Sequence, residues 1–317
     1  LATRTWELIS APGTGTTGST GTAAGTLLER DYRVSTTAPS VAVSADGQQV
    51  FFFSARTDLV PGDTNRAIDL FRKDLRTGVT TRISTDSTGA QLSAGAVGSA
   101  LAITPDARFA VFVAKYQDIR VLWRKDLSTG ELAVVSGTGT WRSLSQAHPV
   151  SVDAHDVAIS DDGRYVAFSA RSTALTPRSI EYLAYRRDMS SAQILRVGVP
   201  TQVNTWEHQV ALDPSGRYVF FQTAANVGAD VDGRTDWYRR DTAAGPTAPL
   251  VLVTSQASGA PSAHRITTAD AWGSLQVLSG ERVVVATLQA LVPVDTNARV
   301  DLYRKDLGTG AVTPALG

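Results

Sequence analysis

The sequence of 317 residues contains no cysteine and only one methionine, so disulfide bonds, thiolate metal sites and cysteine nucleophiles are excluded. It has no apolar run of about 18 residues, the length that a membrane-spanning helix needs. The formal net charge is zero, so composition gives no overall attraction to nucleic acid or to an anionic membrane. The G-x-S-x-G elbow, the H-E-x-x-H helix and the phosphate-binding Gly-Lys loop are also missing.

Hydrophobic residues make up 43% of the chain, which is enough for a sizeable core. Of the 30 basic residues, only Lys73, Lys115, Lys125 and Lys305 are lysines, and this arginine bias favours a GC-rich bacterial genome over a binding role. The chain opens on Leu1 without methionine, as a processed secretory precursor or a trimmed chain would. We therefore expect an extracellular or periplasmic protein whose signal peptide has been removed.

One tetrad recurs through the chain: an aromatic residue, Arg, then Lys or Arg, then Asp. Its copies start 52, 62, 53 and 65 residues apart. Before each tetrad two apolar runs flank a turn, and a short β-type run follows it, so each unit is predicted to be four short strands, a to d. No convincing amphipathic helix is present. The tetrads are Phe71–Asp74, Trp123–Asp126, Tyr185–Asp188, Tyr238–Asp241 and Tyr303–Asp306.

Repeated four-stranded units are typical of a β-propeller, in which each blade covers the apolar face of its neighbour. The sequence predicts an all-β fold of five four-stranded blades, or six if residues 1–40 hold a degenerate blade. The stretch "TWELIS" at residues 5–10 is predicted to be a lone strand that closes the ring on the last blade and removes two exposed sheet edges. The Gly/Ser/Thr-rich remainder of residues 1–40 is predicted to be loop, and the final "AVTPALG" an extra or frayed strand. Within a single domain, 1–317, the predicted blades span residues 41–84, 98–136, 155–199, 208–254 and 272–317.

The first unit, "SADGQQVFFFSARTDLVPGDTNRAIDLFRKDLRTG", resembles the PD40-type, WD40-like repeats of the bacterial TolB-like propeller superfamily. The resemblance covers about residues 39–317 and is carried by "ADG" or "DDG" turns and "YRRD" or "YRKD" strands. It implies the propeller fold. Since such propellers include protein-docking platforms, peptidase accessory domains and sugar-processing relatives, function has to be argued from a site.

The tetrad itself is predicted to be structural, because five near-copies cannot all be catalytic. Its aromatic residue should pack against the neighbouring blade, with the following Arg on the opposite face of the strand. Its Asp should begin a tight c–d hairpin, where the carboxylate accepts backbone N–H bonds. The tetrad's Arg and Asp could also pair between blades.

The long connections are predicted to gather at one end of the blades. Because the strands of a blade alternate in direction, the a–b and c–d turns share one end, and the b–c and d–a connections share the other. The turns are short, whereas the connections run to roughly 10–25 residues. Function concentrates on such loops over a rigid scaffold, so the loop-rich face is the predicted working face.

All four histidines and three of the six tryptophans fall in the d–a connections or at the start of strand a, which lines the mouth of the central channel. Indole, imidazole, carboxylate and guanidinium groups there could form a pocket for a sugar, an aromatic group or a peptide side chain. Alternatively, the tryptophans plug the mouth and the histidines satisfy loop carbonyls. The predicted ligand-binding residues are Trp141, His155, Trp206, Glu207, His208, His264, Arg265 and Trp272.

Catalysis is weakly indicated at the same place. A glycosidase needs two carboxylates beside the channel, and Asp153, Asp156 and Glu207 are the acids expected near it. The candidate catalytic residues are Asp153, Glu207 and His208.

Two b–c loops share a D-x-N-x3-D spacing that suits a calcium ion. Oxygen ligands at positions 1, 3 and 7 resemble those of EF-type loops, although the Gly at position 6 and the bidentate acid at position 12 are missing. Asx-turns before a strand would account for the same residues without metal. The candidate ligands are Asp63, Asn65 and Asp69 in the first loop and Asp295, Asn297 and Asp301 in the second, with Asp230, Asp232 and Asp236 in a related loop.

The sequence thus predicts a secreted bacterial propeller, a monomer, that binds a protein, glycan or small-molecule ligand through the loop-rich face at the channel mouth. No nucleic acid partner and no membrane span are expected, and Ca²⁺ is the only candidate cofactor. One alternative is an enzyme acting on a glycan or a small secreted metabolite at the same mouth. The other is a structural interaction module of a larger protein.

Overall fold

The computed structural model describes residues 9, 41–116, 118–138, 148–149, 151–171, 182–191, 193–199, 209–225, 227–228, 235–245, 247–255, 275–287, 290–297 and 299–315. The chain divides into two compact units, Leu1–Ala154 and His155–Gly317, and each is described by itself. Unit 1 holds blades 1 and 2. Unit 2 holds blades 4 and 5 and all but the first two residues of blade 3.

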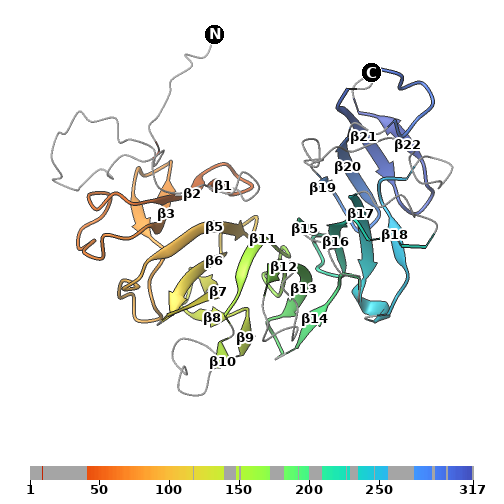
Figure 1. Ribbon diagram of the computed structural model, residues 1–317. Helices are drawn as coiled ribbons and strands as arrows, with labels where there is room; N and C mark the ends of the chain where they lie inside the picture. Colours follow the sequence, from red (N-terminus) through yellow and green to blue (C-terminus); the bar gives the residue numbers. More distant parts are fainter. Residues whose placement is uncertain are drawn as a thin grey trace, which may run out of the picture. The chain divides into compact units, whose positions relative to one another are not determined.

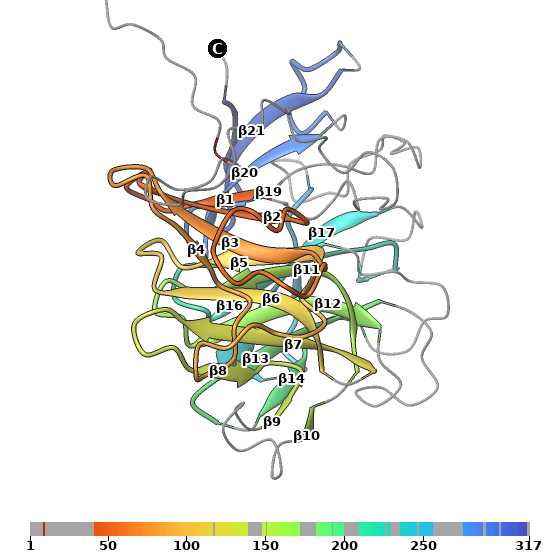
Figure 2. The ribbon, with the colours of Figure 1, turned by 90° about the vertical axis from the view of Figure 1, so that its left-hand side faces the viewer.

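The described residues form five four-stranded antiparallel sheets, and in each sheet the strands follow chain order (Figure 1). Figure 2 shows this order for β5 to β8 of blade 2. The predicted all-β fold of five blades is therefore confirmed. Among these residues there is no α-helix and no sixth four-stranded sheet, and the only helical turn described is the 3-10 turn η2 (Thr242–Ala244).

In unit 1, blade 1 comprises β1 (Val41–Val43), β2 (Gln49–Ser54), β3 (Asp69–Asp74) and β4 (Thr80–Arg82), and blade 2 comprises β5 (Ala96–Ile103), β6 (Phe109–Tyr116), β7 (Ile119–Asp126) and β8 (Leu132–Val134). Blade 3 comprises β11 (Asp153–Ile159), β12 (Tyr165–Arg171), β13 (Leu183–Asp188) and β14 (Ile194–Arg196). Blade 4 comprises β15 (Val210–Leu212), β16 (Tyr218–Thr223), β17 (Asp236–Asp241) and β18 (Leu250–Leu252), and blade 5 comprises β19 (Leu275–Val277), β20 (Arg282–Thr287), β21 (Asp301–Asp306) and β22 (Val312–Pro314).

The aromatic residue of each tetrad lies in the third strand of its own blade, as predicted. Its ring pairs across the sheet with strand b, as Phe221 and Tyr238 do with ring centroids 6.3 Å apart. On the same face, Tyr238 packs with Ala184 and Val197 of the preceding blade. Strand c therefore buries an aromatic side chain between consecutive blades, which accounts for the recurrence of the tetrad. The five residues are Phe71, Trp123, Tyr185, Tyr238 and Tyr303.

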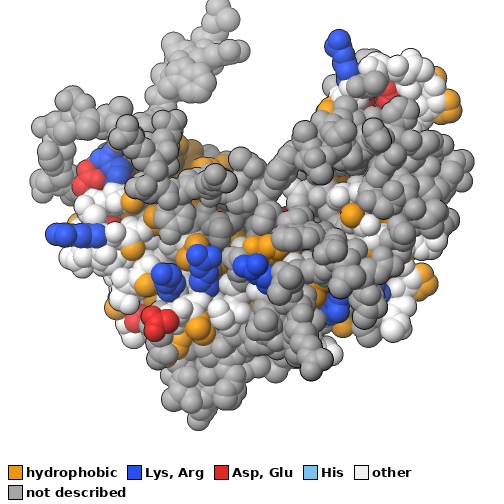
Figure 3. Space-filling view, viewed as in Figure 1, with side chains coloured by type: hydrophobic (Ala, Val, Ile, Leu, Met, Phe, Trp, Pro, Cys, Tyr) orange, Lys and Arg blue, Asp and Glu red, His pale blue; other side chains and the backbone are white. Residues whose placement is uncertain are grey.

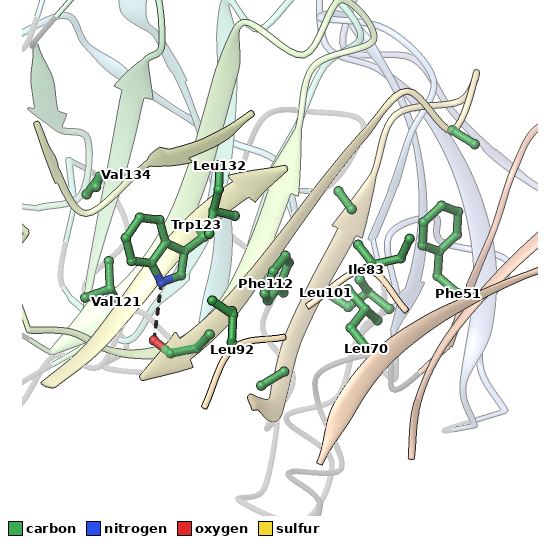
Figure 4. Close-up of a cluster of buried hydrophobic side chains, with 14 residues drawn as sticks. Phe51, Leu70, Ile83, Leu92, Leu101, Phe112, Val121, Trp123, Leu132 and Val134 are labelled. Atoms are coloured by element: carbon green, nitrogen blue, oxygen red, sulfur yellow. Dashed lines mark hydrogen bonds between the residues drawn. The ribbon is translucent and has the colours of Figure 1, made fainter. Parts of the chain in front are cut away.

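The largest described cluster of buried side chains joins blades 1 and 2 of unit 1 (Figure 4). Trp123 is fully buried there, and its indole N–H donates to the carbonyl of Ala114 at 3.4 Å. Phe51 and Leu70 approach from blade 1, and both are 0% exposed. The apolar face of one blade is thus covered by the next.

The second residue of the tetrad points away from the aromatic residue, as predicted. In blade 4, Arg239 donates from Nη1 to the carbonyl of Gly280 in blade 5 at 2.6 Å, and its guanidinium lies 4.8 Å from the ring centroid of Tyr218. Guanidinium groups stack favourably on aromatic faces in this way. The residue therefore helps to join a blade to the one that follows it.

In blades 2 to 4 the tetrad Asp pairs with an arginine of its own blade, so for these described residues the expected pairing between blades was wrong. In these three blades the partner is the arginine just before strand b: Arg217 donates to both carboxylate oxygens of Asp241 at 2.9 and 2.6 Å. Arg164 and Asp188 repeat this in blade 3 at 3.0 and 2.9 Å. In blade 1, Asp74 accepts instead from the Gln49 side chain at 2.8 Å. Because strands b and c are hydrogen-bonded neighbours, the residue that precedes one lies beside the residue that ends the other.

The third residue of the tetrad joins a blade to the one before it, a role that sequence analysis did not assign. Lys125 donates from Nζ to the carbonyls of Thr85 and Asp86 in blade 1 at 3.0 and 2.7 Å. Arg240 donates from Nε to the carbonyl of Val197 in blade 3 at 2.5 Å. Buried carbonyls need such partners. The side chains at this position, Lys73, Lys125, Arg187, Arg240 and Lys305, are all buried.

Of the two ends of the chain, only the C-terminal one tests its predicted role. The final residues supply a regular fourth strand of blade 5, since β22 pairs with β21. The predicted closing strand, residues 5–10, lies outside the described residues apart from Ile9. That residue is partly buried and packs against Phe52, Leu59 and Phe71 of blade 1.

Candidate functional site

Each blade has a tight-turn end, formed by its a–b and c–d turns. In blade 1 the a–b turn places Asp46 Oδ1 2.5 Å from the Ser44 hydroxyl and 3.0 Å from the Gln48 N–H, both of which donate to it. In the c–d turn, Asp74 accepts from the Gln49 side chain at 2.8 Å and from the backbone N–H of Thr77 at 2.9 Å, and these two bonds lower the pKa of Asp74 to about 2. The polar groups at this end are thus largely bound within their own turns.

The opposite, loop-rich end carries the b–c and d–a connections. In blade 1 these are residues 55–68 and 83–95, and they are fastened to each other. The N–H of Ala96 donates to the carbonyl of Ile68 at 2.6 Å. Gly95 has a φ of +62°, and a Cβ at this position would lie 2.3 Å from the same carbonyl oxygen. Only glycine allows this close approach, so the two loops form one ordered surface.

Blade 2 departs from the expected long b–c connection. Its strands β6 and β7 continue to the pair Tyr116↔Ile119, so only two residues connect them. The cross-strand pairs Ala114↔Val121 and Tyr116↔Ile119 are apolar, and this explains why strand pairing replaces a loop there. The b–c connection of blade 2 is therefore a tight hairpin in place of a loop.

Most of the predicted ligand-binding residues lie outside the described residues. Asp153 and His155 are two positions apart on β11, the first strand of blade 3. The d–a connection before it contains a two-stranded ribbon of β9 (Gly137–Thr138) and β10 (His148–Pro149). Convergence of the predicted residues at a channel mouth stays a prediction. Those outside the described part are Trp141, Trp206, Glu207, His208, His264, Arg265 and Trp272.

Asp156 is the described acid with the most unusual environment. Its carboxylate accepts the N–H of Val157 at 2.9 Å and that of Val210, in β15 of blade 4, at 3.0 Å. Burial raises the pKa of Asp156 to about 7, although the two N–H bonds act in the opposite direction. The side chain therefore links the first strands of blades 3 and 4 and is poised to titrate near neutral pH.

In the first D-x-N-x3-D loop, Asn65 forms an Asx-turn. Its Oδ1 accepts the N–H of Ala67 at 2.9 Å, while its Nδ2 donates to Asp69 Oδ2 at 3.0 Å. The other oxygen of Asp69 accepts from the Ser84 hydroxyl at 2.5 Å. Burial raises the pKa of Asp69, and the bonds from Ser84 and Asn65 oppose that rise. Asn65 thus presents a donor to Asp69, and calcium binding would require its amide to turn over.

The other two loops repeat parts of this arrangement. Asn297 donates from Nδ2 to Asp301 at 2.9 Å and accepts the N–H of Arg299 at 2.7 Å. Asp295 accepts from the hydroxyl of Tyr303. In the related loop, Asp236 accepts from Thr254, whereas Asp230 and Asp232 lie outside the described residues. Across the described ranges, no three His, Cys, Asp or Glu side chains are grouped to hold a metal ion.

Calcium binding is tested by chelation. If Ca²⁺ occupies these loops, EDTA should lower the melting temperature, because a ligand bound only to the folded state stabilises it by about 2.7 kcal/mol at a hundredfold excess over Kd. Asp63→Ala should abolish part of that difference. Asp58→Ala serves as the control, since Asp58 is exposed and pairs with Arg56. Equal melting temperatures in excess calcium and in EDTA would contradict the site.

Sequence analysis missed a group of cations at the loop-rich end of unit 1. Lys115 and Arg120 are exposed on the β6–β7 hairpin, and Arg66 is exposed in the b–c loop of blade 1. The local pattern gave no clear signal, because Gln117 and Asp118, which connect the two strands, are not among the usual two-residue hairpin turns. The proximity of the cations depends on strand register, which the sequence did not specify.

No family model matches the chain, and none of the curated proteins compared matches it. The chain is similar to TolB-like propellers. TolB from Acinetobacter baumannii is 17% identical with a TM-score of 0.47, and the match covers 88% of this chain and 54% of that one. A putative TolB from Agrobacterium tumefaciens is 14% identical with a TM-score of 0.47 over 87% and 79% of the two chains. Oligogalacturonate lyase from Vibrio parahaemolyticus is 11% identical with a TM-score of 0.49, and the match covers 87% of this chain and 64% of that one.

This chain spans about half the length of the first of these proteins. At such identities the similarity concerns the fold alone. In the described part of the chain, no helix is long and apolar enough to cross a membrane.

Proposed function

We propose that this protein binds a ligand or a partner protein through the loop-rich ends of its blades, at the mouth of the propeller channel. The observation that supports this is the difference between the two ends. In blade 1 the a–b and c–d turns are short and bind Asp46 and Asp74 within themselves, whereas residues 55–68 and 83–95 form an extended ordered surface. Loops held by a rigid scaffold lose little entropy on binding, which favours recognition there.

The test is a ligand screen followed by truncation at both ends. Trp206→Ala should weaken binding by about 2–4 kcal/mol if the indole is an anchor, and His208→Ala should also weaken it. If a histidine contacts the ligand, affinity should change between about pH 5.5 and 7.5. Arg76→Ala in the exposed c–d turn of blade 1 is the control and should bind normally. Loss of binding in Arg76→Ala alone would reverse the assignment of the working end.

An enzyme acting on a glycan or a small metabolite is the second candidate, and Asp156 is the observation that favours it. A carboxyl group that titrates near pH 7 suits general acid or base work. Its bonds to two backbone N–H groups also suit a structural role, so binding remains the first proposal. Turnover of a glycan library that disappears in a folded Asp156→Asn variant would support the enzyme.

An extracellular or periplasmic location and a monomeric state belong to the same proposal. Cell fractionation with immunoblotting would test the location, and light scattering of the purified chain would test the monomer. A structural interaction module, the remaining alternative, would show no binding to any small molecule in the screen.

A further inference from the structure

The residue just before each tetrad shows whether a blade is covered by the one that follows it. In blades 1, 3 and 4 this side chain is at most 4% exposed and packs in one cluster with the first or second strand of the next blade in the same unit. The three residues are Leu70, Ala184 and Trp237. In blade 5 the residue is Leu302, which is 38% exposed. Among the described residues of unit 2, blade 5 therefore leaves uncovered the face that these blades bury against a neighbour.

The uncovered face carries nearly the same sequence as a covered one. Residues 59–78 of blade 1 and 291–310 of blade 5 are identical at 14 of 20 positions, from the b–c connection through the c–d turn. In both, a Leu and the tetrad Arg occupy alternate positions of the third strand and so share one face. Figure 3 shows hydrophobic side chains at the surface in the region of blade 5, at the upper right of the view. What covers this sequence in blade 1 therefore shows what would fit it in blade 5.

In blade 1 the cover comes from the d–a connection and from blade 2. Asn65 donates from Nδ2 to the carbonyl of Leu92 in that connection at 2.9 Å. The N–H of Ala96, at the start of β5, donates to the carbonyl of Ile68 at 2.6 Å. Leu70 is buried in the same cluster as Leu92 and Ala96. Both polar and apolar groups of the face are thus satisfied by the next repeat.

The matching groups of blade 5 are exposed instead. Asn297 and Val300, the counterparts of the two bonded loop residues of blade 1, are both exposed, Val300 to 62%. Apolar side chains grouped at a surface mark interaction sites. A further sheet packed on this face would remove Val300 and Leu302 from water, which is the favourable term in such packing.

The chain leaves blade 5 in the same way as it leaves blade 1. The N–H of Ala315 donates to the carbonyl of Leu302 at 2.7 Å. In blade 1 the N–H of Ile83 donates to the carbonyl of Leu70, also at 2.7 Å, and the connection 83–95 starts from that point. Because this connection supplies part of the cover, its counterpart has to continue from β22. That requirement favours a repeat in the same polypeptide over a separate partner.

We propose that this face of blade 5, centred on Val300 and Leu302, is the docking surface for a further repeat of the same kind. The repeat consists of a d–a connection and a four-stranded blade that follow β22 in the same polypeptide. Its third strand should carry an aromatic residue and, two positions later, a Lys or Arg that donates to carbonyl groups after β22, as Lys125 does to Thr85. The inference goes beyond the proposed function, because it concerns the side of a blade and not its loop-rich end.

The first test compares two matched substitutions in the 317-residue chain. Leu70→Ala empties a covered position and should clearly lower the urea midpoint of unit 1. Leu302→Ala alters an uncovered position, so the midpoint of unit 2 should shift by at least about threefold less. Hydrogen exchange of β3 and β21, measured by mass spectrometry, assigns each shift to its blade. Equal shifts would show that the chain or a second copy already covers the face, and would overturn the proposal.

The second test supplies a repeat. A copy of residues 86–136, joined after Gly317, places the connection and blade 2 behind blade 5 in the register that they have behind blade 1. The extension should slow hydrogen exchange in β21 about tenfold or more and raise the urea midpoint of unit 2. In the extended chain, Leu302→Ala should then shift the midpoint about as much as Leu70→Ala does in unit 1.

Two controls make this result specific. A scrambled extension of the same composition should leave the exchange of β21 unchanged. Thr309→Ala, an exposed substitution at the tight-turn end of blade 5, should have the same effect with and without the extension. No slowing of exchange by the copied repeat, or the same slowing by the scrambled one, would overturn the proposal.

Discussion

Trp123→Ala is expected to lower the free energy of unfolding of unit 1 by about 3–5 kcal/mol. The indole is fully buried, and its removal deletes the largest side chain at the junction of blades 1 and 2 and leaves a cavity. The loss should appear as a lower midpoint of urea unfolding, followed by circular dichroism. Because the chain has two compact units, only the part of the circular dichroism change that comes from the unfolding of unit 1 should shift to lower urea.

Two control variants make this result specific. Trp123→Phe keeps an aromatic ring in the same place and should lose clearly less stability. Val79→Ala changes a side chain that is 48% exposed and should stay within about 0.5 kcal/mol of wild type. A Trp123→Ala variant that unfolds at the wild-type midpoint would show that the tetrad aromatic residue does not hold the blades together.

Asp156→Asn is expected to remove a pH dependence of stability in unit 2. The folded protein keeps the Asp156 proton up to about pH 7, whereas an unfolded chain releases it near pH 4. Between these values the folded state binds more protons, so wild-type stability should fall as pH rises and level off above pH 7. The fall should be about 2–4 kcal/mol, with the lower figure allowing for partial exposure of the residue to solvent.

Asparagine stays neutral and can still accept the N–H of Val210, so the variant should match wild type near pH 4 and be more stable at pH 8. The measurement is urea unfolding of both proteins across this range. Asp188→Asn is the matched control, because its bonds to Arg164 hold the pKa of Asp188 below its usual range, so the stability that this variant loses should be constant between about pH 4 and pH 8 and shrink only as more acid is added. Parallel profiles for wild type and Asp156→Asn would contradict the raised pKa.

The candidate site illustrates what local pattern can and cannot predict. The D-x-N-x3-D spacing identified loops whose side chains do meet, since Asn65 reaches Asp69 and Asn297 reaches Asp301. The spacing did not show which way the side-chain amides of Asn65 and Asn297 point. In each, Oδ1 accepts the backbone N–H two residues later, so Nδ2 is the atom that faces the aspartate. Gln91, which donates to Asp63 at 2.9 Å, comes from another connection and could not be found from the motif.

The sequence by itself determined the blades, because strand structure and tight turns depend on neighbours along the chain. Alternating apolar runs, the five tetrads and the Asp that opens each c–d turn are local features, and all five tetrad aromatic residues lie in strand c as predicted. Only the tertiary structure decided how the tetrad joins blades through Lys125 and Arg239. It also decided that Lys115 stands opposite Arg120. Those contacts are set by strand register and by packing between residues far apart in the sequence, and a repeated motif does not specify either.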